Sequence, residues 1–245
     1  ATKNKIKTSI NSHGGLLTKD LSKRFIESNL TNMSFSFDGA SKEIYEKARV
    51  GSNYEDVISN INYLCELKKE RGSKINIVIT CLASNVEILN EIPDLVKLSS
   101  NIGVDSLHIK ARLKNWIKAP DKSYSFTVKN TDDYVSFDKI QSESKNLAKE
   151  LNLKFSIGDS EDLYSNENHC HWPWNSLYVS TEGSVVPCCV IGMPETLNMG
   201  SIIETNLSKI WNSKQYRTFR KEIISNKKPE TCNNCYRNDN FTHTS

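Results

Sequence analysis

The chain has 245 residues, of which 37% are hydrophobic, and a formal net charge of +3. This length allows one or two domains with a real core. The charge is too small to indicate a nucleic-acid partner, and no apolar run approaches the ~20 residues of a membrane span. Seven cysteines without a visible secretory signal predict a cytoplasmic protein with reduced thiols, in which a C-x-x-C pair is a metal site or a redox pair.

The first half of the chain alternates short strands with helices. Strands are expected at 6–10, 33–37, 75–81 and 105–109, and helices at 18–28, 41–48, 54–69 and from 85 onward. Thr18, Ser41 and Asn85 are expected to cap helices, and Pro93 to kink the last of them. This alternation predicts right-handed βαβ units on a parallel sheet. About four strands are too few for a closed eight-stranded barrel, so we predict an α/β fold with an open or partial sheet.

Three regions are expected along the chain. Residues 1–125 form the partial (β/α) unit, and 126–165 form a connection of one helix, one strand and a polar linker. Residues 166–245 form a small cysteine-rich α+β domain. In this last region a strand-like run at 176–180 leads into a turn at Gly183, and 206–213 and 214–225 have helical patterns.

Four cysteines near the C-terminus form the most informative motif. Cys170 precedes the strand-like run, Cys188 follows the next one, and Cys232 and Cys235 form the C-x-x-C pair. Thiolates are soft ligands that select iron–sulfur clusters or zinc. The hairpin turn would bring Cys170 close to Cys188, and the C-x-x-C pair adds two ligands from one loop. The four thiolates can therefore converge on one metal centre.

Iron–sulfur ligation is favoured over the alternatives. Zinc sites with four cysteines usually combine two C-x-x-C pairs, and this sequence has one; a disulfide is the weaker alternative still. Cys189 alternates with Cys188 along a strand, so we expect it on the opposite face as a buried or free thiol. Cys65 and Cys81 fall on a helix face and a strand end, and we expect both in the core.

A longer frame surrounds the cysteines. It comprises Cys170, Pro173-Trp174, Leu177-Tyr178-Val179, Gly183, Cys188, Asn198-Met199-Gly200-Ser201-Ile202, Ile210-Trp211-Asn212-Ser213, Tyr216, Arg220 and Cys232-x-x-Cys235. This frame resembles the SPASM/twitch domain of radical S-adenosylmethionine enzymes, which carries one or two auxiliary [4Fe-4S] clusters. No cysteine follows Cys235, which fits one cluster. The resemblance implies that Cys170, Cys188, Cys232 and Cys235 hold a single auxiliary [4Fe-4S] cluster.

The segment from Ser36 to Gly51 is similar to the S-x-D-G-A…Y-x-x-x-R-x-G stretch of the same enzymes. The resemblance implies a partial radical-SAM barrel in which Ser36 and Arg49 help to bind S-adenosylmethionine. An arginine can pair with the methionine carboxylate bidentately, and a hydroxyl at the carboxyl end of a strand faces the barrel mouth. Without the resemblance, we would expect Ser36 to be an exposed turn residue and Arg49 to form an ion pair at the surface. We expect Asp38 to shape the turn.

One motif of the family is missing. Its radical chemistry needs a C-x-x-x-C-x-x-C loop that holds a second [4Fe-4S] cluster, and the sequence contains none. We expect that loop in an N-terminal part of a longer parent protein, the alternative being a natural remnant.

Catalytic residues stay unknown. His108, Lys110 and Arg112 are candidate pocket residues by position only, because alternation does not tell whether His108 or its neighbours Leu107 and Ile109 face inward.

The resemblance implies the C-terminal part of a radical S-adenosylmethionine oxidoreductase that oxidises or modifies a peptide or small molecule. Its auxiliary cluster is expected to transfer an electron rather than to ligate the substrate. A reductase or flavodoxin-type protein is the expected electron donor. The alternative is a non-catalytic iron–sulfur or zinc module that binds a partner such as a peptide.

Overall fold

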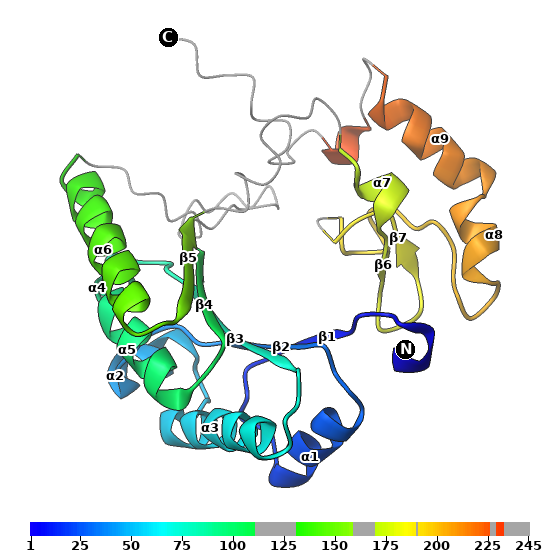
Figure 1. Ribbon diagram of the computed structural model, residues 1–245. Coiled ribbons are helices and arrows are strands. Elements are labelled where there is room, and N and C mark those ends of the chain that lie inside the picture. Colours follow the sequence, from blue (N-terminus) through cyan, green and yellow to red (C-terminus); the bar gives the residue numbers. More distant parts are fainter. Residues whose placement is uncertain (111–130, 159–169, 190, 226–228, 233–245) are drawn as a thin grey trace. The chain divides into compact units, whose positions relative to one another are not determined.

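The computed structural model describes residues 1–110, 131–158, 170–189, 191–225 and 229–232 (Figure 1). The chain divides into two compact units. The described residues up to 158 belong to the first unit, and those from 170 onward belong to the second. Across these residues, every helix is too short or too polar to cross a membrane.

A parallel sheet forms the centre of the first unit. Its strands are β1 (Ser9–Ser12), β2 (Asn32–Ser36), β3 (Asn76–Leu82), β4 (Ser106–Lys110) and β5 (Lys154–Gly158). Each strand pairs in parallel with the one before it in the chain, so that the order is β1-β2-β3-β4-β5. The helices cover the convex face of the curved sheet (Figure 1). This order is that of a (β/α) barrel, and it confirms the predicted α/β fold with a partial barrel.

The helices begin where the sequence provides capping side chains. They are α1 (Lys19–Glu27), α2 (Lys42–Ala48), α3 (Tyr54–Glu70), α4 (Val86–Asn90), α5 (Ile92–Ile102) and α6 (Thr131–Glu150), and a 3-10 turn, η1, spans Thr2–Asn4. Thr18 accepts the Leu21 N–H at 3.1 Å and Asn85 accepts the Ile88 N–H at 2.9 Å, which confirms two predicted caps. Ser41 caps α2 in the same way.

The expected kink at Pro93 is wrong, because the chain forms two helices there. α4 ends at Asn90, and α5 begins at Ile92 with Pro93 in its first turn. A proline is tolerated at that position, since the first N–H groups of a helix have no intrahelical partner. Glu91 therefore lies at the junction between the two helices, outside both of them.

One face of the sheet packs against the helices to form the main core. Its buried strand residues are Met33, Phe35, Ile77, Ile79, Cys81, Leu107 and Ile109. Val57, Ile61 and Leu64 face them from α3. Cys65 and Cys81 are both buried here, as predicted, and burial raises the pKa of Cys65 to about 12. Burial raises the pKa of Cys81 as well, so both thiols are neutral members of this core.

The second unit is built from short elements. They are α7 (Trp172–Asn175), β6 (Tyr178–Val179), β7 (Val185–Val186), α8 (Leu207–Trp211), α9 (Lys214–Ile223) and a 3-10 turn, η4 (Glu230–Cys232). The strand-like run at 176–180 is thus a strand only at its centre. A small core joins these elements; its buried members are Val185, Val186, Ile191, Met199, Ile210, Tyr216, Phe219 and Ile223.

The hairpin of β6 and β7 has its turn at Gly183, which has a φ of +81°. A Cβ there would lie 2.9 Å from Ile203 Cγ1, at the end of a side chain that can move. The positive φ is the reason that the position favours glycine. The segment around Gly200 continues the sheet. Val185 donates its N–H to Gly200 O at 2.8 Å, and Met199 donates its own to Val185 O at 2.8 Å. The motif Asn198-Met199-Gly200-Ser201 therefore pairs with β7.

Candidate functional site

Three of the four predicted cluster ligands gather at the small core of the second unit. Cys170 lies just before α7, Cys188 follows β7, and Cys232 ends η4. All three are half-buried and pack against this core. Cys235 lies outside the described residues. Within the described part of the chain, no group of three or more His, Cys, Asp or Glu side chains is arranged to hold a metal, so ligation by these cysteines stays a prediction.

Cys189 differs from its neighbour Cys188. Cys189 is exposed, whereas Cys188 is half-buried against the small core. Both residues follow β7 in a bend and turn. This arrangement separates one core-facing thiol from one solvent-facing thiol, and it leaves Cys188 as the candidate ligand.

Arg220 connects the helices around these cysteines. Its Nε donates to Pro173 O at 2.8 Å, and its Nη1 donates to Trp211 O at 2.8 Å. The guanidinium carbon lies 4.3 Å from the ring centroids of both Trp211 and Tyr216, which is cation–π geometry. Arg220 thus links α7, α8 and α9, and this explains the spacing of Trp211, Tyr216 and Arg220 in the sequence.

Two buried polar groups at this core have no hydrogen-bond partner in the part of the chain that the structure describes. The Tyr216 hydroxyl and Arg220 Nη2 are buried and have no hydrogen-bond partner among the described residues. Burial raises the pKa of Tyr216 to about 12; Arg220 opposes this shift and Cys188 adds to it. Such orphaned donors are rare in native proteins and point to an absent acceptor. A sulfur-rich centre on the nearby cysteines would provide acceptors, so these residues fit an iron–sulfur cluster.

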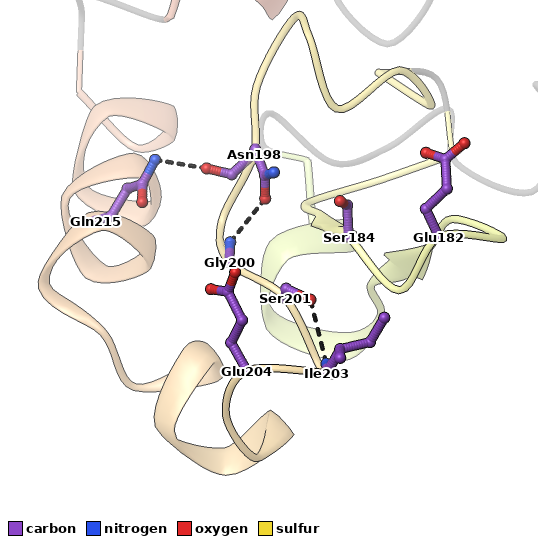
Figure 2. A pocket seen from close by; sticks show the side chains of 8 residues that line it. All are labelled: Glu182, Ser184, Asn198, Gly200, Ser201, Ile203, Glu204 and Gln215. Carbon is purple, nitrogen blue, oxygen red and sulfur yellow. Dashed lines mark hydrogen bonds between the residues drawn. The ribbon is translucent and has the colours of Figure 1, made fainter.

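A polar pocket lies elsewhere in the second unit (Figure 2). It has a volume of about 540 Å³, and its lining residues are Glu182, Ser184, Asn198, Gly200, Ser201, Ile203, Glu204 and Gln215. Gln215 Nε2 donates to Asn198 O at 2.7 Å, and Asn198 Oδ1 accepts the Gly200 N–H at 2.8 Å. The pocket has no cysteine in its lining, so it shares no residue with the candidate metal centre.

In the first unit, Asp38 fixes the loop that follows β2. Its carboxyl is almost fully buried, with Oδ1 accepting the Leu82 N–H at 2.7 Å. Its Oδ2 lies 2.6 Å from Arg49 Nη2. Asp38 therefore shapes the turn, as expected. Arg49 forms an ion pair, but a mostly buried one, and its Nε is buried without a partner among the described residues. A ligand carboxylate would meet a guanidinium already oriented by Asp38.

Glu91 holds the same loop from the other side. Its Oε2 accepts the N–H groups of Ala40 at 2.6 Å and Ser41 at 3.1 Å. The Ser41 hydroxyl donates to Glu91 Oε1, and the Tyr54 hydroxyl donates to Ala40 O. The sequence does not reveal this role of Glu91, because it arises only when the α4–α5 junction packs beside a loop that precedes it by about fifty residues.

Gly39 allows the loop to turn where it does. Its φ is +125°, and a Cβ there would lie 2.8 Å from Ile44 Cγ2 and 3.0 Å from the Tyr45 nitrogen. An L side chain would be strained by this φ and would meet backbone. The S-x-D-G segment is therefore a fixed structural unit, with Ser36 at the carboxyl end of β2 and Arg49 at the end of α2.

The face of the sheet opposite the helices carries a polar row. Ser36, Thr80, His108 and Ser156 are successive register partners across β2, β3, β4 and β5. His108 Nδ1 lies 2.5 Å from Ser156 Oγ, and Ser34 and Thr80 share a hydrogen bond of 3.0 Å. Barrel interiors are usually filled with branched apolar side chains. This polar face is suited instead to a polar ligand.

The structure resolves which side chains of β4 face this polar row. Leu107 and Ile109 are buried in the main core, while His108 and Lys110 are exposed on the other face. Partial burial lowers the pKa of His108, and Lys110 lowers it further. Arg112 lies outside the described residues. His108 and Lys110 therefore share a face with Ser36.

Comparisons with known proteins bear on both units. Residues 170–236 match the SPASM family, an iron–sulfur cluster-binding domain. No curated protein matches the sequence. Among solved structures, SuiB from Streptococcus suis matches with 15% identity and a TM-score of 0.64, over 89% of this chain and 52% of SuiB.

Two liganded structures of SuiB also match. SuiB bound to S-adenosylmethionine matches with 13% identity and a TM-score of 0.61, over 89% of this chain and 50% of SuiB. SuiB bound to its precursor peptide SuiA matches with 15% identity and a TM-score of 0.63, over 88% of this chain and 50% of SuiB. At these identities the likeness shows a shared fold, and the chain spans about half the length of SuiB.

Proposed function

We propose that this chain is the C-terminal part of a radical S-adenosylmethionine enzyme that modifies a peptide. The chain carries a SPASM domain and shares the fold of SuiB, as expected for the radical S-adenosylmethionine enzymes with such a domain. One observation carries the proposal. The SPASM match spans all four predicted ligands, and the three that the structure describes pack against one small core.

The auxiliary cluster belongs to this proposal. Cys170, Cys188, Cys232 and Cys235 would hold one [4Fe-4S] cluster, which supplies one-electron transfer when bound. Four protein thiolates leave no iron open for substrate, so electron transfer is favoured over substrate ligation. A reductase or flavodoxin-type electron donor and a cytoplasmic location are part of the same proposal. They rest on the family resemblance.

The first unit is proposed to bind S-adenosylmethionine and the peptide. SuiB binds S-adenosylmethionine and a precursor peptide, and we extend both ligands to this chain. Ser36 would offer its hydroxyl at the carboxyl end of β2, and Arg49, oriented by Asp38, would face the methionine carboxylate. The peptide would lie on the polar face that carries His108 and Lys110; this supports a peptide over an apolar small molecule.

Binding of S-adenosylmethionine tests the role of Ser36 and Arg49. In equilibrium dialysis with the full parent protein, Ser36→Ala and Arg49→Gln should each weaken binding roughly ten- to a hundredfold, because a hydrogen bond to a charged group contributes ~1.5–3 kcal/mol. Ser34→Ala is the matched control, since Ser34 lies on the same strand and face. Equal affinity of all four proteins would contradict the proposed contacts.

A second candidate is a non-catalytic module that binds a peptide. The observation in its favour is that β1 and β5 each pair on one side only among the described strands, and such edges can add a peptide strand. Cleavage of S-adenosylmethionine by the anaerobically reconstituted parent protein would rule this candidate out. Peptide binding without any cleavage would favour it.

A further inference from the structure

We propose that Tyr216 and Arg220 are positioning residues that donate hydrogen bonds to the sulfur atoms of the metal centre at Cys188 and so raise its reduction potential. The inference rests on the proposed function, because it requires a cluster on the SPASM cysteines. The sequence predicts cysteine ligands for this site, and the structure adds Tyr216 and Arg220 from α9 as residues that act on it.

The contacts of Arg220 leave one of its nitrogens without a partner among the described residues. Two of its nitrogens are used by the carbonyls of Pro173 and Trp211, both at 2.8 Å. The rings of Trp211 and Tyr216 hold the guanidinium in place at 4.3 Å. Its third nitrogen, Nη2, is buried and has no partner among the described residues. A guanidinium held by four contacts, whose two Nη2 N–H groups have no partner in the described part of the chain, is pre-organised for an acceptor.

The Tyr216 hydroxyl is a second donor at the same place. The Tyr216 side chain is fully buried in the small core that Cys170, Cys188 and Cys232 contact. Its hydroxyl has no partner among the described residues. Cys188 packs against the same core, and the Arg220 guanidinium carbon lies 4.3 Å from the centroid of the Tyr216 ring. An isolated buried hydroxyl is unfavourable by roughly 1–3 kcal/mol, so a simple packing role would be better served by phenylalanine.

The positive charge of Arg220 would favour an anionic centre over a neutral one. Among the described residues, Arg220 takes part in no ion pair. A cluster bound by four thiolates is anionic, and hydrogen bonds to its sulfurs help to set its potential. Reduction adds one negative charge, so donors and a cation stabilise the reduced state more than the oxidised one. Their removal should therefore lower the potential.

A redox titration of the reconstituted full-length protein, followed by electron paramagnetic resonance, tests this. Tyr216→Phe removes one oxygen and keeps the ring, and Arg220→Lys keeps the charge but loses the planar donor set. For each variant we expect a reduction potential that is more negative by about 59 mV. For a one-electron couple this shift is a tenfold change in the equilibrium constant of reduction. Tyr178→Phe and Arg217→Lys are matched controls, because both residues are exposed in the same unit, and neither should move the potential.

The outcomes separate the two proposals. An unchanged potential in Tyr216→Phe, with full iron and sulfide content, would overturn this inference and leave the proposed cluster intact. Wild-type protein that binds zinc without sulfide would overturn the proposed function and this inference together. If Arg220→Lys does not fold, Tyr216→Phe still decides. A purely structural role for Tyr216 predicts equal or higher thermal stability and no shift in potential.

Discussion

The two units of the chain are stabilised in different ways. In the first, a five-stranded sheet packs one face against helices, and fully buried side chains such as Phe35 and Ile79 form a continuous core. In the second, each strand has only two residues, and the core is a small group around Tyr216. Conformational entropy opposes order in both units. The first unit offsets it with buried apolar area, whereas the second has much less area to offer.

This difference indicates what the cysteines contribute. Three half-buried thiols contact the small core, and two buried donors beside them have no partner among the described residues. A metal centre would add the missing stabilisation and satisfy those donors, because metal binding and folding are coupled in small domains. We therefore expect that the predicted centre, when bound, stabilises the second unit and leaves the first unit unaffected.

Loss of one ligand should have the largest effect. Cys232→Ala should lose the metal and abolish the cooperative unfolding of the second unit, because structural metal binding is worth ~10–16 kcal/mol in small zinc domains. Hydrogen exchange, read peptide by peptide, should show lost protection from residue 170 onward and normal protection in β2 and β3. Cys189→Ala, which removes an exposed thiol, is the control. A Cys232→Ala protein with a cooperative transition and full metal content would contradict the account.

A substitution in the core of the first unit should affect that unit alone. Ile79 is fully buried and pairs in register with Phe35 and Leu107. Ile79→Ala should lower the free energy of unfolding of this unit by about 2–5 kcal/mol through lost burial and a cavity. Ile6→Ala, at an exposed isoleucine of the same unit, should have little effect. Equal losses in denaturant titrations of the two variants would show that this core is not the source of stability.

The Asp38–Arg49 pair should have an intermediate effect. The Asp38 side chain is 10% exposed and the Arg49 side chain 26%, so Arg49→Gln leaves a mostly buried carboxylate unpaired. We expect a loss of roughly 2–4 kcal/mol in the free energy of unfolding, somewhat below the range for a fully buried pair. Adding Asp38→Asn to Arg49→Gln should recover part of it in the same denaturant titration. A double variant that is less stable than Arg49→Gln would exclude an unpaired charge as the cause.

The smallest effect concerns His108. Partial burial and then Lys110 lower its pKa, so the unfolded chain binds this proton at higher pH than the folded chain. The contribution of His108 to the free energy of unfolding is therefore present above the ordinary pKa of histidine. It is lost as the pH falls through the pKa of His108 in the folded state. Proton NMR should give a folded pKa below ~6.5, and Lys110→Ala should raise it without restoring it fully. A value above the ordinary range would contradict the placement of Lys110 beside His108.

Much of the first unit could be predicted from its sequence. The buried strands near Phe35 and Ile79 and the caps Thr18 and Asn85 depend on local patterns, and the structure confirms them. The two helices in place of a kinked one, and the face on which His108 lies, depend on tertiary packing. Alternation alone cannot tell the two faces of a strand apart.

In the candidate sites, too, local motifs could be predicted from the sequence, whereas contacts that depend on tertiary packing could not. The four cysteines are visible from spacing, because ligand chemistry requires thiols in a particular frame. Glu91 is not visible, since it reaches the loop at Gly39 from a distant helix junction. Tyr216 and Arg220 belong to the recognised frame. That each has a buried group without a partner in the described ranges appears only when burial and hydrogen bonds are known.

The most direct test of the account is the content of iron and acid-labile sulfide per chain, with a visible spectrum, in protein purified without oxygen. We predict about four irons and four sulfides, the content of one [4Fe-4S] cluster on Cys170, Cys188, Cys232 and Cys235. Zinc without sulfide, in a colourless protein, would contradict it. The chain would then keep its fold and its SPASM domain, but the second unit would have a structural metal rather than a redox centre.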